Sequence, residues 1–217
     1  MKKRLCITAI LVVLFVLTGA EFYRTLMNRQ GLVYAEALSE VAVTVDQEEM
    51  TLYDMAFYVA YQEKEVQKDA VIYNDEKPHK YWNAHTNGEF VRVVAEQAVV
   101  DMAVHDELFY RMACEEGIQL GEEEMLYLSN EVYDFCSDLT DEQYANLGIT
   151  AEDIETAMTK IALANKYQSI LSQMEDVDYE DYDYTGAVYE LMLSEHDIEV
   201  DESVWDRIAV GNITVNY

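Results

Sequence analysis

The residues that could carry out acid–base, nucleophilic or metal chemistry are few and widely spaced in this chain. Four histidines stand at positions 79, 85, 105 and 196, the first two in a polar connection and His105 on a helix between Asp101 and Asp106. They are not accompanied by a serine or cysteine nucleophile signature, metal-ligand spacing, a phosphate-binding loop or a dinucleotide-binding loop. We therefore interpret the histidines as surface or capping residues, and expect no catalytic residue, no metal and no cofactor.

The sequence does not decide whether two of the cysteines form a disulfide. Cys6 falls in an apolar N-terminal run, whereas Cys114 and Cys136 fall on helices that should be neighbours. In an oxidising compartment these two could form one disulfide. Equally, each could be a small buried apolar side chain.

Residues suited to binding are more numerous than residues suited to catalysis, because the chain holds ten methionines and 17 tyrosines. Both side chains suit apolar surfaces that adapt to different partners. The helix after Thr51 carries Leu52, Met55, Ala56 and Val59 on one face and three aromatic residues on another. A helix that is apolar on two faces is deeply buried or partly open to a ligand. The candidate polypeptide-binding residues are Tyr53, Met55, Phe57 and Tyr61.

The charge of the chain is strongly acidic, with a formal net charge of −29. Residues 31–217 hold 42 acids and nine bases, a formal charge of −33. Nucleic acid is excluded as a partner, because binding it depends on basic groups that release phosphate counterions. The acidity is typical of a soluble surface on which copies repel one another. The paired acids of residues 175–184 lack the spacing and the glycine of a calcium-binding EF-hand loop.

The N-terminus indicates export. Lys2, Lys3 and Arg4 precede an uncharged run from Leu5 to Ala20, and basic residues of this kind stay in the cytoplasm. The run is either cleaved after Ala20 or retained as a membrane anchor, which apolar residues after Ala20 could lengthen. Residues 1–35 are therefore predicted to be a signal peptide or an anchor, and residues 36–217 an extracytoplasmic domain.

Periodicity predicts that this domain is mainly α-helical with a few short strands. A β-branched run over 41–45 is a strand, followed by a polar turn over 46–49. Capping boxes that start at Thr51, Thr140 and Thr150 open three helices, and Gly117 and Gly148 close two. The predicted helices cover residues 51–68, 89–116, 122–139, 140–148, 150–174 and 186–196. The strand over 41–45 is expected to meet a returning strand near Val200 or Ile213, where two further short β-branched runs lie over 198–200 and 213–215, with a short helix around Trp205 between them.

Two stretches resemble the N-terminal helical domain of the SurA and PrsA secreted foldases. One is ELFYRMACEEGIQLGEEE over 107–124, where a helix ends at a glycine and the next begins on glutamates. The other is the strand, turn and capped helix VAVTVDQEEMTLYDM over 41–55, in which Asp46-Gln47 replaces the Asn-Gly that is usual there. The final segment around IEVDESVWDRI resembles the part that returns to complete that domain.

The resemblance implies a chaperone-like protein that has no enzymatic activity. In SurA and PrsA a parvulin prolyl isomerase domain is inserted before the returning segment, whereas this chain has only an acidic hinge over 175–184 in that position. The expected function is therefore non-catalytic binding of unfolded or exported polypeptides outside the cytoplasm. The alternative is an interaction subunit that holds one partner in a membrane or envelope complex.

Overall fold

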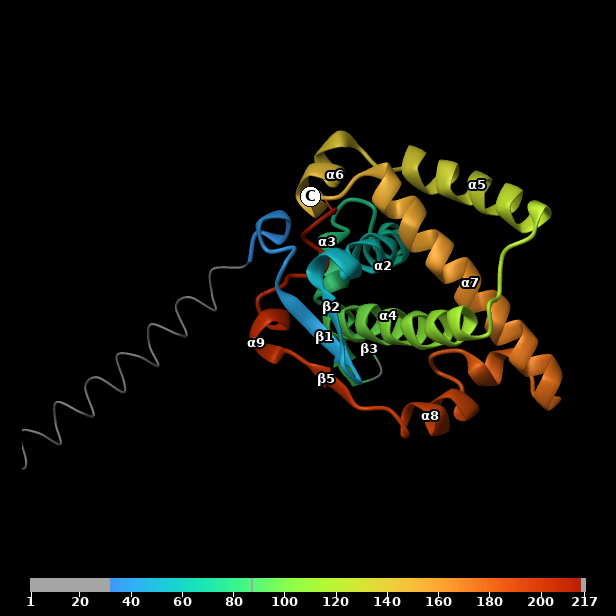
Figure 1. Cartoon of the computed structure of the whole chain (residues 1–217). Helices are drawn as coiled ribbons and strands as arrows, with labels where there is room; N and C mark the ends of the chain where they lie inside the picture. Colours follow the sequence, from blue (N-terminus) through green and yellow to red (C-terminus); the bar gives the residue numbers. More distant parts are fainter. Residues whose placement is uncertain (1–31, 87, 216–217) are drawn as a thin grey trace, which may run out of the picture.

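The computed structural model of this protein describes residues 32–86 and 88–215. The described residues are mainly helical, as predicted, with one small sheet and one short hairpin (Figure 1). The apolar N-terminal run lies outside them, so its expected role as a signal peptide or anchor stays a prediction. Within residues 32–86 and 88–215, no helix combines the length and the hydropathy that crossing a membrane requires.

Three antiparallel strands form the sheet in the order β2-β1-β5. They are β1 (Val41–Val45), β2 (Glu48–Thr51) and β5 (Ile198–Val200), and Val43 faces Val200 in the register of β1 with β5. The predicted strands over 41–45 and 198–200 are confirmed. The predicted turn over 46–49 was too long, because Glu48 and Glu49 pair with β1 although their side chains are exposed at the sheet edge.

Four long helices and one short helix form most of the molecule, and local signals explain their ends. They are α2 (Leu52–Tyr73), α4 (Val91–Glu115), α5 (Glu122–Ser137), α6 (Asp141–Leu147) and α7 (Ala151–Glu175). Capping boxes begin α2, α6 and α7, as predicted. Gly117 and Gly148 adopt left-handed φ angles of 67° and 70°, which suit glycine at helix ends. After Gly117, the N–H of Ile118 donates to the Ala113 carbonyl at 2.9 Å and satisfies one of the last carbonyls of α4.

The remaining elements are short. Their bounds are η1 (Tyr34–Glu36), α3 (His79–Trp82), β3 (His85–Thr86), β4 (Glu89–Phe90), η2 (Tyr179–Tyr182), α8 (Ala187–Leu193) and α9 (Glu202–Trp205). Residues 213 and 214 form bends, and residue 215 has no regular structure, so the strand expected over 213–215 is absent. The segment over 175–184 is folded onto the helices, because η2 buries Tyr182.

The first and last described segments meet at one side of the core (Figure 1). Strand β5 lies next to β1, and Trp205 is 8% exposed, as expected for a segment that completes the domain. Tyr34 precedes the expected domain boundary, yet it is buried and donates to the Leu52 carbonyl at 2.6 Å. The folded body therefore includes residues just before position 36.

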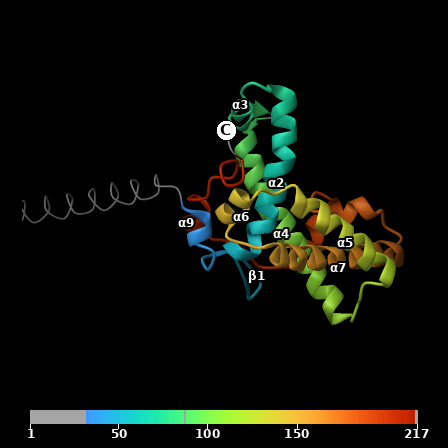
Figure 2. The same cartoon turned by 90° about the horizontal axis from the view of Figure 1, so that it is seen from above.

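Helix α7 packs against both α4 and α5, and α5 lies on the outside of the molecule. Only Leu128 and Phe135 of α5 are buried. A second view shows the far end of α2 and the start of α4 projecting together with α3, away from α5 and α7 (Figure 2). The site described next lies on the α5–α7 side.

Candidate binding groove

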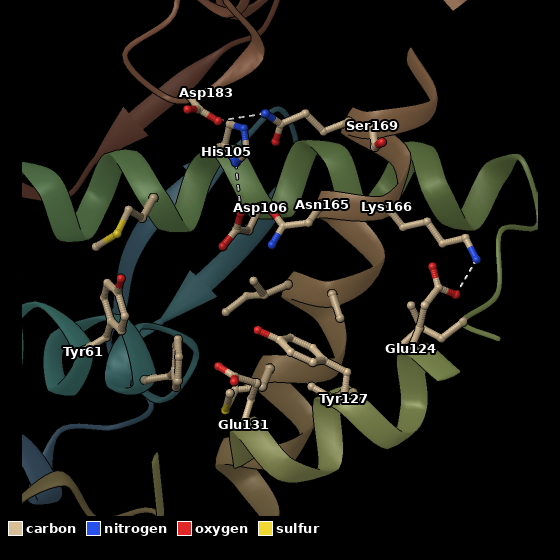
Figure 3. A pocket seen from close by; sticks show the side chains of 18 of the residues that line it. Tyr61, His105, Asp106, Glu124, Tyr127, Glu131, Asn165, Lys166, Ser169 and Asp183 are labelled. Atoms are coloured by element: carbon tan, nitrogen blue, oxygen red, sulfur yellow. Dashed lines mark hydrogen bonds and ion pairs between the residues drawn. The ribbon is translucent and has the colours of Figure 1, made fainter. Parts of the chain in front are cut away.

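A cavity of about 880 Å³ lies between α4 and α5, with α7 beneath it (Figure 3). We call it the α4–α5 groove. Its floor includes Met158, Ile161 and Ala162 of α7, and its end is closed by Phe57 and Tyr61 of α2. The groove is of the size that holds one or a few side chains of a bound molecule.

One wall is α5, which is fixed at both ends. Near its start, Lys166 of α7 binds Glu124 with a Nζ–Oε2 distance of 2.6 Å and also donates to the Gln119 carbonyl. Beyond its end, Lys64 of α2 binds Asp138 at 2.6 Å. Phe135 near that end packs on Phe57, with the ring centroids 5.0 Å apart. The middle of α5, which presents Tyr127 to the groove, is left open between these contacts.

The opposite wall consists of α4 and the η2 segment (residues 179–184), which one buried side chain of α4 and one of α7 hold in place. His105 Nε2 donates to the Tyr182 carbonyl at 3.0 Å, and His105 Nδ1 lies 2.9 Å from Asp106 Oδ1. Gln168 of α7 donates from Nε2 to the Tyr179 carbonyl at 3.0 Å and to Asp183 Oδ1 at 2.8 Å. Tyr179, Asp183 and the following Tyr184 are thereby held at the rim of the groove.

The groove lining carries more negative than positive charge. Five carboxylates line the groove, whereas Lys166 is the lysine that lines it and His105 is the histidine. The Gly121 N–H, and then Lys166, hold the pKa of Glu124 below its usual range. Burial raises the pKa of Tyr58 well above its ordinary value, and the neighbouring Asp106 charge raises it further. The lining carboxylates are Asp106, Glu123, Glu124, Glu131 and Asp183.

The predicted binding residues are divided between three places. Phe57 and Tyr61 stack on each other at 6.1 Å and line the α4–α5 groove. Tyr53 lies in a second cavity of about 550 Å³, which Phe57 also lines; there the Tyr53 hydroxyl donates to Asp153, and its pKa rises to about 12. Met55 is fully buried in the core and has no surface to offer a ligand. The structure thus brings together two of the four residues.

Several groove residues were not identified from the sequence. The interpretation of His105 as a surface residue was wrong, because it is 4% exposed and packs on Phe109 and Tyr189. Its spacing of three and four residues from Met102 and Phe109 was the available signal. Tyr127 gave no such signal, since its place in the groove depends on the position of α5 relative to α4.

The cysteines and the acidic segments show no further site within residues 32–86 and 88–215. Cys114 and Cys136 are free thiols, so the structure does not contain the disulfide that the sequence left open. Cys114 is exposed rather than buried. Across these same residues, no three His, Cys, Asp or Glu side chains are grouped so that they could hold a metal ion.

Comparison with known proteins adds no relative: no family model, curated protein or solved structure matches this chain.

Proposed function

We propose that this protein is a non-catalytic, extracytoplasmic binding protein of the chaperone type, and that it holds unfolded or exported polypeptide segments in the α4–α5 groove. The observation that carries the proposal is the groove itself. It has an apolar floor, aromatic side chains from α2, α5 and the η2 segment, and walls that ion pairs and hydrogen bonds hold in place.

The composition of the lining supports a polypeptide rather than one small compound. Methionine and aliphatic side chains of the floor adapt to different apolar groups, and tyrosines add polar hydroxyl groups at the rim. Tyr61 and Tyr127 are 39% and 66% exposed, so they are available before any ligand binds. The sequence resemblance to the SurA and PrsA N-terminal domain favours the same function.

The proposed location follows from the N-terminal sequence. Export places residues from about position 36 outside the cytoplasm, with the N-terminal run either cleaved or kept as a single membrane anchor. The partners are then unfolded or secreted polypeptides, and the membrane if the anchor is retained.

A second candidate function is supported by another surface. Apolar side chains are exposed where the end of α2 meets the start of α4, including Ile72 at 84%, Tyr73 at 61% and Phe90 at 52%. A patch of this kind fits a permanent contact with one partner subunit. Recovery of a single stoichiometric partner that is lost when Ile72 is replaced by serine would favour this alternative.

An aggregation assay tests the proposed function. We expect the protein to slow aggregation of several unrelated unfolded proteins, and the double variant Tyr61→Ser, Tyr127→Ser to bind them roughly tenfold or more weakly. The matched control is Leu126→Ser, Tyr133→Ser, which removes two exposed apolar side chains of α5 that lie outside the groove. Equal activity of the two double variants would rule out the groove as the binding site.

A further inference from the structure

The helix α5 presents a regular row of side chains to the groove. Glu123, Tyr127 and Glu131 are four residues apart, and all three line the cavity. Residues at this spacing lie on one face of a helix, and eight residues span about 12 Å along its axis. The row is therefore acid, aromatic, acid, with roughly 6 Å between neighbours.

The two acids of this row are available for a ligand. Among the described residues, neither the Glu123 nor the Glu131 carboxylate forms a hydrogen bond or an ion pair, and both residues are exposed. The other carboxylates of the groove already have a partner: Lys166 forms an ion pair with Glu124, His105 lies against Asp106, and Asp183 accepts a hydrogen bond from the neutral amide of Gln168. The groove carboxylates that have no partner among the described residues are therefore the two on α5.

The side-chain oxygen of Gln168 is a second hydrogen-bond acceptor of the groove that lacks a partner among the described residues. Gln168 lines the groove and is fully buried, and both of its Nε2 hydrogen bonds go to oxygen atoms, which fixes the orientation of the amide. Its Oε1 accepts no hydrogen bond from the described part of the chain. An acceptor buried without a donor costs free energy, and a donor from a ligand in the groove reaches this atom only if the Gln168 amide moves.

We infer that the preferred occupant of the α4–α5 groove is an extended polypeptide segment with basic residues at positions i and i+4 and an apolar residue at i+2. This inference rests on the proposed function and names its ligand class. In an extended chain, residues i, i+2 and i+4 point to the same side, and four residues span about 13 Å. That span matches the roughly 12 Å between Glu123 and Glu131 along α5.

The contacts then follow the row on α5. The two basic side chains meet Glu123 and Glu131, and the apolar side chain between them meets Tyr127. A cation near Tyr61 or Tyr127 also gains attraction from the faces of these rings. Charge pairs of this kind select the partner and its register more than they add affinity, so the spacing of the basic residues is what the groove reads.

The experiment compares three labelled peptides by fluorescence anisotropy. The full chain is held in a non-ionic detergent, and detergent alone is the blank. The first peptide contains Lys-Val-Phe-Val-Lys between glycine–serine ends. The second contains Lys-Lys-Phe-Val-Val, which has the same composition and charge, so it controls for general attraction to an acidic protein. The third contains Gln-Val-Phe-Val-Gln and has no basic residue.

We expect the first peptide to bind roughly threefold to tenfold more tightly than the second or third at low salt, since exposed ion pairs are individually weak. The variant Glu123→Gln, Glu131→Gln should make the first and second peptides equal. The control Glu122→Gln, Asp134→Asn removes two exposed acids of α5 that do not line the groove, and should keep the preference. A preference that survives Glu123→Gln, Glu131→Gln, or that is lost in the control, would overturn the inference.

The same peptides separate failure of the inference from failure of the proposed function. If all three bind equally and Tyr61→Ser, Tyr127→Ser weakens all of them, the groove binds polypeptide without reading basic residues, and only the inference is overturned. If the tyrosine variant changes the binding of none of them, both the inference and the proposed function are overturned.

Discussion

Asp46 shows how one side chain connects three segments of the fold. It occupies the turn between β1 and β2 with a left-handed φ of 59°. Its carboxylate accepts from the Asp197 N–H at 3.1 Å and from Arg111 Nη1 at 3.1 Å, and lies 3.1 Å from His196 Nδ1. Asp46 therefore anchors the turn between β1 and β2 to α4 and to the residues before β5.

These contacts make a pH-dependent contribution to stability. The Asp197 N–H, then His196 and Arg111, hold the pKa of Asp46 below its usual value. A carboxyl whose pKa is lower in the folded state than in the unfolded state stabilises the fold at pH values above its unfolded pKa, which is about 4. This contribution is lost as the pH falls through the pKa of the folded state. Asp46→Asn tolerates the left-handed backbone but removes the charge. We expect the melting temperature of this variant to lie below that of the unmodified chain at pH 7, and the difference to disappear below about pH 4. Thermal unfolding of both chains between pH 3 and 7 measures this difference. A difference that stays constant over that range would contradict the prediction.

Glu96 of α4 should have the opposite pH dependence. Burial raises its pKa to about 7, the nearby Arg92 lowers it, and Asp206 adds to the rise. The folded chain therefore keeps a proton that the unfolded chain releases near pH 4, and stability falls as pH rises from about 4 through 7. We expect Glu96→Gln to raise the melting temperature at pH 8 and to leave it nearly unchanged at pH 4. Glu115→Gln, at an exposed position of the same helix, is the control that should show no such difference.

At the scale of elements, α2 fixes the C-terminal loop through a single buried acid. The Glu63 carboxylate accepts from the backbone N–H groups of Gly211 at 2.5 Å, Ile213 at 3.1 Å and Thr214 at 2.5 Å, and from the Thr214 hydroxyl. Gly211 is required here because a Cβ atom would lie 2.5 Å from the Trp82 ring. The predicted strand over 213–215 is absent because its N–H groups bind this side chain instead of a neighbouring strand.

Replacing Glu63 should release this loop. Glu63→Gln places an amide N–H₂ beside backbone N–H groups, which can only donate, so we expect a loss of about 1–3 kcal/mol in the free energy of unfolding. Trp82 is fully buried beside the loop, and its fluorescence in a urea titration reports the change. The control Glu65→Gln, two residues away on α2, should change stability by less than about 0.5 kcal/mol. A Glu63→Gln variant as stable as this control would show that the loop does not depend on the carboxylate.

Local sequence signals predicted the long helices well, because the causes of their ends are local. Thr140 with Gln143, Thr150 with Asp153, and Gly148 act within one turn of a helix. Pairing of Glu48 and Glu49 with β1, by contrast, is imposed by the hairpin against the strand preference of glutamate. The burial of Glu63 and His105 depends on partners 148 and 77 residues away, respectively, so the sequence of each helix alone could not predict it.

At the scale of the whole molecule, the groove exists because α7 spaces α4 and α5 apart while ion pairs hold α5 at both ends. Periodicity identified Phe57 and Tyr61 as candidates, but it could not show that Tyr53 faces a different cavity. The acidic surface of the molecule fits the same account, since it would attract basic segments and keep loaded copies apart. We propose that unfolded polypeptide occupies the α4–α5 groove.

Site-specific photo-crosslinking tests this claim most directly. Benzoylphenylalanine is placed at Tyr127, which lines the groove, or at Tyr133, which does not, and each chain is irradiated with an unfolded, labelled polypeptide. The two positions lie on the same helix and are similarly exposed, at 66% and 73%. The account predicts strong crosslinking from position 127 and little from position 133, and unlabelled polypeptide should compete only with the former. Equal crosslinking from both positions, or none from position 127, would contradict it.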